Sequence, residues 1–277
     1  MEKKSWVCTV ITQFALCVAL YCAINLGEPQ TPTYRTGIHR QRNQIYFISV
    51  QGGFRPLKHQ TRLLKQIEKV MYAYNVGFVI NISELGEDDP LLQNATQYFN
   101  SLKTPWYTTI ALKADESDYF FKQFNISSGS TLDILALNTQ KIQDSSSGIE
   151  ELQLKQLSRK LELSNSNWRI AAAFYPLFCN QSLEQTQAKR NDFLHQMLLK
   201  HGVDAYISGQ SCDTEARIGI GGPYFTTISQ GSYPPKEMVN MFLLHRVSPL
   251  EITTYGVGFK GDIIDESTVR QKGREVM

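Results

Sequence analysis

The sequence is poor in cysteine, and it lacks both a block of like charge and an internal repeat. Three of its five cysteines lie in one apolar segment near the N-terminus, so Cys179 and Cys212 allow at most one disulfide in the rest of the chain. A disulfide-stapled scaffold is therefore excluded. The formal net charge is only +2 and no basic cluster stands out, so no nucleic-acid partner is expected. With no repeat, the 277 residues fit one large domain with its own core.

Charge is also absent from residues 5–26, an apolar run that follows Lys3 and Lys4. The run is long enough for a transmembrane helix, which needs roughly 20 residues, and the lysine pair favours a cytoplasmic N-terminus. We interpret residues 1–28 as an uncleaved signal anchor that attaches the chain to a membrane through residues 5–26. A cleaved signal peptide and a buried globular helix remain as alternatives, although residues 19–24 fit a cleavage site poorly. The expected location is the secretory pathway, as a single-pass membrane protein with a lumenal or extracellular domain, or else as a secreted protein.

Composition divides the remainder into three parts. Residues 29–43 are polar, contain proline and have no period, which is typical of a linker or stem. Residues 44–260 are expected to form the main domain, and residues 261–277 a C-terminal tail. Four N-glycosylation sequons suggest a glycoprotein, and any sequon that is used must lie on the surface. These sequons begin at Asn81, Asn94, Asn125 and Asn180.

Apolar runs rich in β-forming residues alternate with helical patterns in the main domain, which predicts an α/β fold with a largely buried sheet. The expected strands are 45–50, 76–82, 105–112, 131–139, 168–178 and 203–209, followed by a β-rich end with "PYFTTIS", "MFLLHRV" and "LEITTYGV". The expected helices are 58–74, 90–102, 149–164 and 187–201. Ligands of such folds bind where loops leave the carboxyl ends of strands. The loops concerned are 51–54, 83–89, 112–115, 174–179 and 210–212.

These five loops resemble, in order, the five motifs of the calcineurin-like metallophosphoesterase superfamily, and they are most similar to the small purple acid phosphatases. Where that family has GDWG, FVISTGDNFY and PWYNVLGNHD, this chain has "VQGG", "FVINISELGE" and "PWYTTIALKA". Where the family has WRIVVGHHPVYS and then HGVDLY before GHDH, this chain has "WRIAAAFYPLFC" and "HGVDAYISGQSC". The resemblance covers roughly residues 44–260. It implies a four-layer α/β/β/α sandwich, with two packed sheets flanked by helices.

The resemblance also implies where a metal centre would lie. The family holds two ions, iron paired with iron, zinc or manganese, which clamp a phosphate and activate a water. None of the corresponding positions keeps its family residue. They fall on Gln51, Glu84, Glu87, Leu112, Lys113, Phe174, Tyr175, Gln210 and Cys212. Leu112 and Phe174 cannot ligate, and the rest carry too little negative charge to offset about four positive charges. We therefore expect no catalytic residue, no metal and no cofactor.

The function that follows is that of a pseudoenzyme: a catalytically inactive purple acid phosphatase-like protein that serves as a lumenal binding or scaffold module for an unidentified protein or anionic partner. One alternative is an acid phosphatase-type phosphoester hydrolase with an atypical metal site, for instance one ion on Glu84, Glu87 and Asp88. A second is an anion- or glycan-binding module in the vacated cleft, with Lys113 as a contact. Otherwise the loop 84–89 is expected to be solvated, and no histidine falls on a motif loop.

The last expectation implied by the resemblance concerns the two remaining cysteines. In the family, the loops that would carry Cys179 and Cys212 face one cleft. An oxidising lumen favours a disulfide between thiols held in this way. Two separate thiols are the alternative.

Overall fold

The structure is a computed structural model. It describes residues 10–19, 43–99, 104–109, 119–127, 129–139, 149–176, 185–209, 224–227, 241–258 and 260–271. The chain divides into two compact units between Ile38 and His39. In the first unit, residues 10–19 are helical. No helix within the described residues meets the length and apolarity that a membrane span requires. Most of the predicted span, residues 5–26, lies outside the described residues, so the membrane anchor stays a prediction.

The second unit contains two β-sheets. The six-stranded sheet has the order β11-β10-β9-β1-β2-β3, and the five-stranded sheet has the order β4-β5-β6-β7-β8. The strands of the first sheet are β1 (Ile45–Gln51), β2 (Phe78–Ile82), β3 (Trp106–Thr108), β9 (Phe242–Val247), β10 (Glu251–Val257) and β11 (Ile263–Arg270). Those of the second are β4 (Tyr119–Ser127), β5 (Ser130–Leu137), β6 (Trp168–Ala173), β7 (Ala205–Ser208) and β8 (Tyr224–Thr227).

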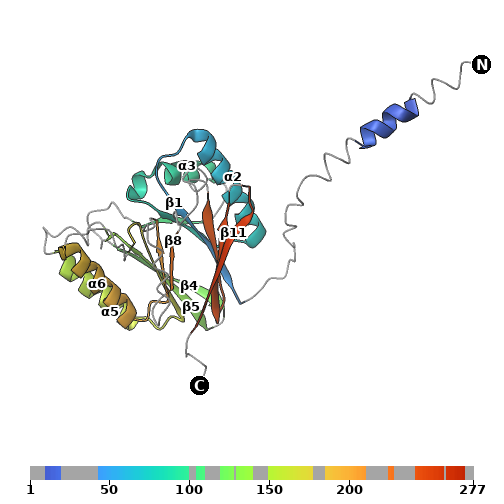
Figure 1. Cartoon of the computed structure of the whole chain (residues 1–277). Helices are drawn as coiled ribbons and strands as arrows, with labels where there is room; N and C mark the ends of the chain where they lie inside the picture. Colours follow the sequence, from blue (N-terminus) through green and yellow to red (C-terminus); the bar gives the residue numbers. More distant parts are fainter. Residues whose placement is uncertain are drawn as a thin grey trace, which may run out of the picture. The chain divides into compact units, whose positions relative to one another are not determined.

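The helices form an outer layer on each side of the paired sheets (Figure 1). They are α2 (Leu57–Tyr74), the 3-10 turn η1 (Gly86–Asp88), α3 (Pro90–Tyr98), α5 (Ile149–Leu163) and α6 (Gln185–Lys200). One apolar core lies between the two sheets, a second joins the six-stranded sheet to α2 and α3, and a third joins the five-stranded sheet to α5 and α6. The predicted four-layer α/β/β/α sandwich is confirmed.

Strand β1 shows how the sequence builds these layers. Successive side chains of a strand point to opposite faces of its sheet. Phe47 accordingly packs in the core between the sheets, while Ile48 packs against the helical layer. Both faces are covered, which explains why β1 and β2 appear in the sequence as continuous apolar runs. On α2, the predicted apolar spacing is buried as expected, at Leu63, Leu64, Ile67, Val70 and Met71.

Two strands were not predicted from the sequence. Strand β4 pairs with β5 in a hairpin, and β11 pairs with β10 at the edge of the six-stranded sheet. The prediction of residues 261–277 as a tail is therefore wrong for residues 263–270. Six of the eight residues of β11 are exposed, so the strand lacks the alternation of apolar and polar residues that marks a half-buried strand.

Burial also corrects one of the four glycosylation predictions. Asn81 lies in β2 and its exposed fraction is 0%. A glycan at this position has no route to solvent in the folded protein, so the prediction for Asn81 is wrong. Asn125 is exposed on β4 and Asn94 is half-buried on α3, so both remain predicted sites. Asn180 lies outside the described residues.

A histidine lies inside the core between the sheets. The imidazole of His245 in β9 is 1% exposed and stacks on Phe47, with 4.3 Å between ring centroids. Its Nε2 lies 2.6 Å from Ser49 Oγ, and its Nδ1 lies 2.9 Å from Thr254 Oγ1. Burial lowers the pKa of His245 from 6.5 to about 3, because the charged form would lose its hydration. A substrate cannot reach these groups, so their role is structural.

This histidine should make stability depend on pH. Between pH 6.5 and about 3 the unfolded chain binds a proton at His245 that the folded chain does not bind. Its contribution to stability is therefore complete above pH 6.5 and is lost as the pH falls, at up to about 1.4 kcal/mol per pH unit. Urea unfolding of the full-length protein between pH 7 and 4.5 should show a shallower loss for His245→Gln. The exposed His59→Gln is the matched control, and equal slopes for His245→Gln and the parent would contradict the assignment.

Candidate vacated metal site

The loops of motifs one, two and four meet at the carboxyl ends of β1, β2 and β6. The backbone N–H of Gly52 donates to Ile82 O at 2.8 Å, which joins the first two loops. The hydroxyl of Tyr175 donates to a carboxylate oxygen of Glu84, which joins the second loop to the fourth across the two sheets. The predicted convergence is thus present for the described positions Gln51, Glu84 and Phe174. The other positions, Leu112, Lys113, Gln210 and Cys212, lie outside the described residues, as does Cys179.

The buried carboxylate at this edge belongs to Asp89, which is 0% exposed. Its Oδ2 accepts the backbone N–H of Gly53 at 2.6 Å and the hydroxyl of Ser83 at 2.6 Å. Its Oδ1 accepts the N–H groups of Leu91 and Leu92 at 2.9 and 3.1 Å, which caps the first turn of α3. We call this set of contacts the Asp89 clamp. It fastens the first motif loop, the second motif loop and the start of α3 to one side chain.

Close packing around the clamp explains a glycine in the first loop. A Cβ atom at Gly52 would lie 2.4 Å from Asp89 Oδ2 and 2.6 Å from Ser83 Cβ, so no larger residue fits without movement of the clamp. Arg55 extends the same cluster. Its guanidinium donates to Gln51 O at 2.5 Å. Burial lowers the pKa of Arg55, and the nearby Asp89 carboxylate opposes that shift.

An aromatic ring occupies the motif-four position. Phe174 is half-buried and packs against the core between the sheets. A Cβ atom at Gly209 would lie 2.9 Å from Ile82 Cγ2 and 3.1 Å from Phe174 Cδ2, so β7 ends tightly against the ring and against β2. Beside it, Tyr175 is held by Tyr206, whose hydroxyl donates to Tyr175 O at 2.7 Å. The ring of Tyr175 lies edge-on to the ring of Phe174.

The described residues do not fit the binuclear centre that the fold family implies. Phe174 supplies only carbon atoms, and Glu84 accepts a hydrogen bond from Tyr175. The two carboxylate oxygens of Asp89 accept hydrogen bonds from four N–H and O–H donors, so they do not face an ion. Within the described ranges, no group of three His, Cys, Asp or Glu side chains is placed to hold a metal ion. No catalytic step through such a centre follows from this arrangement.

The acidic side chains of the loop 84–89 are exposed to solvent as predicted, except at one residue. Glu84, Glu87 and Asp88 are exposed, as a solvated loop requires, but Asp89 is buried. Sequence reasoning therefore missed the residue on which this site depends. A signal was present, because Asp followed by Pro marks the N-cap and first position of a helix. Asp89 and Pro90 occupy those two positions of α3.

Comparisons with known proteins bear on the fold. No protein-family model and no curated protein matches the chain. Among solved structures, one described as GAP50, the anchor in the inner membrane complex of Plasmodium, has a TM-score of 0.64 at 17% identity, and the match covers 84% of this chain and 90% of that one. A predicted phosphoesterase from Streptococcus pneumoniae has a TM-score of 0.37 at 10% identity, over 82% of this chain and 98% of that one. Vacuolar protein sorting 29 from Cryptosporidium parvum has a TM-score of 0.40 at 9% identity, over 83% and 100%.

At these identities the similarity shows the fold alone. The two packed mixed sheets with helices on both outer faces form a metallophosphoesterase-type fold, as predicted.

The Asp89 clamp predicts a large effect of one substitution. Asp89→Ala removes the cap of α3 and leaves the N–H of Gly53 without its acceptor. It should lower the free energy of unfolding by about 2–4 kcal/mol, since a cap contributes about 1 and a buried unpaired group costs about 1–3. Urea unfolding of the full-length protein at neutral pH measures this effect. The adjacent exposed Asp88→Ala is the control and should change stability by less than about 0.5 kcal/mol. Similar small effects for both variants would show that the clamp does not stabilise the loops.

Proposed function

We propose that the protein is a non-catalytic binding or scaffold module with a metallophosphoesterase-type fold. The observation that carries the proposal is the content of the vacated metal site. An aromatic ring, a tyrosine–glutamate contact and the Asp89 clamp occupy the described parts of the site, where a phosphoesterase needs charged ligands that point at its ions.

The site's polarity supports the same proposal. A binuclear centre needs oxygen and nitrogen lone pairs directed inward. Here the motif loops direct N–H and O–H donors from Gly53 and Ser83 inward, toward a protein carboxylate. This arrangement stabilises a negative charge that the chain itself supplies. It leaves binding of a partner at the protein's surface, and not hydrolysis, as the function that the fold supports best.

Neither alternative from the sequence gains support from a specific contact. A hydrolase with one ion on Glu84, Glu87 and Asp88 would need these side chains to converge, but Glu84 contacts Tyr175. For an anion- or glycan-binding module, the proposed contact Lys113 lies outside the described residues.

We further propose that residues 5–26 attach the protein to a membrane of the secretory pathway. The support is the length of the uncharged apolar run and its lysine pair. The Plasmodium structure is described as an anchor in an inner membrane complex, which suggests a comparable anchoring or scaffolding role for this chain.

Metal analysis and an activity assay test the loss of catalysis. The full-length protein, purified without chelators, should hold iron, zinc and manganese well below one ion per chain, and it should not hydrolyse an aryl phosphate when these metals are added. Phe174→His should remain inactive, because one imidazole cannot hold two ions without the other ligands. A native phosphatase of this fold serves as the positive control. A stoichiometric metal ion, or turnover by either protein, would overturn the proposal.

Fractionation and N-terminal sequencing test the membrane anchor. The native chain should stay with membranes in alkaline carbonate and be released by detergent, because its apolar run lies in the bilayer. Leu16→Arg combined with Val18→Arg should shift the protein to the soluble fraction, because two charges in the centre of the run oppose insertion. A mature native chain that begins between Ala23 and Pro29 would show instead that the run is a cleaved signal peptide.

A further inference from the structure

Strand β11 is an edge strand. It closes one side of the six-stranded sheet, and within the described residues no strand pairs with its outer edge. An edge of this kind presents a row of backbone N–H and C=O groups to solvent, which is a template for another strand. At eight residues, β11 is long enough to serve as one.

The other three edges of the two sheets are less suited to pairing. Strand β3 has three residues and β8 has four. Strand β4 has nine residues, but its register shifts between Asn125 and Ser127, and Asn125 starts a predicted glycosylation sequon. In β11, residues 265–270 pair regularly with residues 251–256 of β10, and the register shift is confined to the end near Val257. Short or irregular edges protect a sheet against unwanted pairing, whereas β11 offers six consecutive regularly paired residues, 265–270.

The side chains of β11 divide into two faces. Val269 packs against the core between the sheets, so the odd-numbered residues of the regular stretch 265–270 face inward. The even-numbered residues face the opposite way and are all exposed. In the regular stretch they are Glu266, Thr268 and Arg270. This outer face therefore carries one acid and one base, on either side of a threonine.

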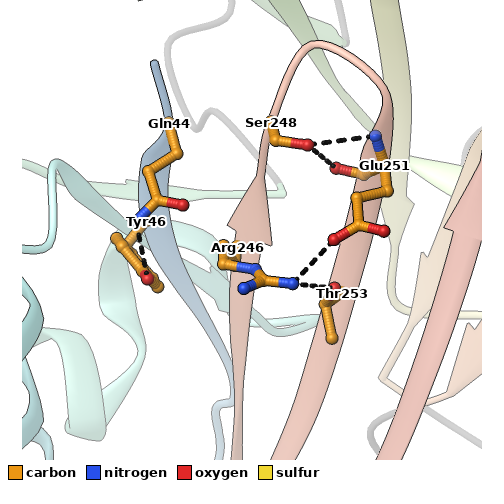
Figure 2. A network of polar contacts seen from close by, with 6 residues as sticks. All are labelled: Gln44, Tyr46, Arg246, Ser248, Glu251 and Thr253. Carbon is orange, nitrogen blue, oxygen red and sulfur yellow. Dashed lines mark hydrogen bonds and ion pairs between the residues drawn. The ribbon is translucent and has the colours of Figure 1, made fainter. Parts of the chain in front are cut away.

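Glu266 and Arg270 do not form an ion pair with each other, and the carboxylate opposite Arg270 on β10 already has a partner. Glu266 and Arg270 are four residues apart on one strand, about 13 Å, which is too far for a contact. Glu251 of β10 lies opposite Arg270 in the register, but its carboxylate accepts from Arg246 at 2.7 Å. Figure 2 shows that Arg246 also reaches Thr253, so this carboxylate already belongs to a network on β9 and β10.

Symmetry limits how two β11 strands can pair. In a two-fold antiparallel pair, each residue lies opposite one that points to the same face. The even-numbered residues must then face even-numbered residues. Centring the pair on Glu266 brings two acids together. Centring it on Thr268 places Glu266 opposite Arg270 of the second copy, twice, with the two threonines opposite each other. Opposite charges and paired threonines both stabilise cross-strand neighbours.

We propose that the edge of β11 is a docking surface for a second copy of this chain, which pairs antiparallel about Thr268 and joins two six-stranded sheets into one. Charge complementarity selects this occupant, because the strand is complementary to itself when inverted. The proposal goes beyond the binding or scaffold role above and does not depend on the state of the metal site. An interface made of one strand from each copy is small, so we expect a dissociation constant on the order of micromolar.

Charge reversal tests the pairing. Sedimentation of the full-length protein in detergent should show a concentration-dependent dimer. Glu266→Arg or Arg270→Glu alone should weaken association by at least about tenfold, because each places like charges opposite one another twice. The double variant Glu266→Arg with Arg270→Glu should restore it, since the pairs re-form with their signs exchanged. A monomer at every concentration up to about 100 μM, or a double variant that associates as weakly as the single ones, would overturn the proposal.

Cysteine cross-linking tests the register. Thr268→Cys places two thiols opposite each other, within the Cα separation of about 4.4–6.8 Å that a disulfide requires. Mild oxidation should therefore give a peptide linked through position 268, identified by mass spectrometry without reduction. Ile264→Cys is the control at an exposed position of the same strand, where the two thiols would be separated by eight residue spacings, about 26 Å. Equal linkage at positions 264 and 268 would refute this register and, with it, the proposed docking.

Discussion

The Asp89 carboxylate is the interaction on which the described parts of the vacated metal site depend. A charge that is removed from water is costly unless donors surround it, and Asp89 has four: Gly53 N, Ser83 Oγ, Leu91 N and Leu92 N. In an enzyme of this fold, two cations would hold the loops together by attracting ligands from each of them. Here one anion holds the first two loops and the start of α3 by accepting from each of them. The electrostatic requirement of the site is thereby reversed, since the loops now need to direct donors inward.

That reversal explains why the other changes in the site are compatible with a stable fold. If the site binds no cations, as proposed, the position of Phe174 needs no imidazole, and an aromatic ring there adds apolar contact with the core between the sheets. Glu84 accepts from Tyr175, and this contact links the two sheets at this edge. A clamp, a ring and a tyrosine contact therefore hold together the described loops that metals would otherwise hold.

The central strands were predictable from the sequence because a strand buried on both faces has a continuous run of apolar residues, as in β1 and β2. The order of motif loops one, two and four was predictable for the same reason, since they follow the apolar strands β1, β2 and β6. Strand β11 was not predictable, because an exposed face and a free edge remove the apolar alternation. The burial of Asp89 was also missed. Its charge suggests solvent, and only the three-dimensional meeting of two loops shows that donors surround it, although the following proline indicates a helix N-cap.

The direction of β11 determines where the motif loops of the two copies would lie in the proposed dimer. Strand β1 runs antiparallel to β9, β9 to β10, and β10 to β11, so β11 runs opposite to β1. Antiparallel pairing of two copies through β11 then reverses the direction of β1 between them. The motif loops follow the carboxyl end of β1, so the vacated sites of the two copies would lie at opposite ends of the joined sheet. No single small ligand would contact both sites. A dimer of this kind would present two separate and oppositely directed surfaces, which suits a scaffold that connects partners and does not suit an enzyme with a shared active site.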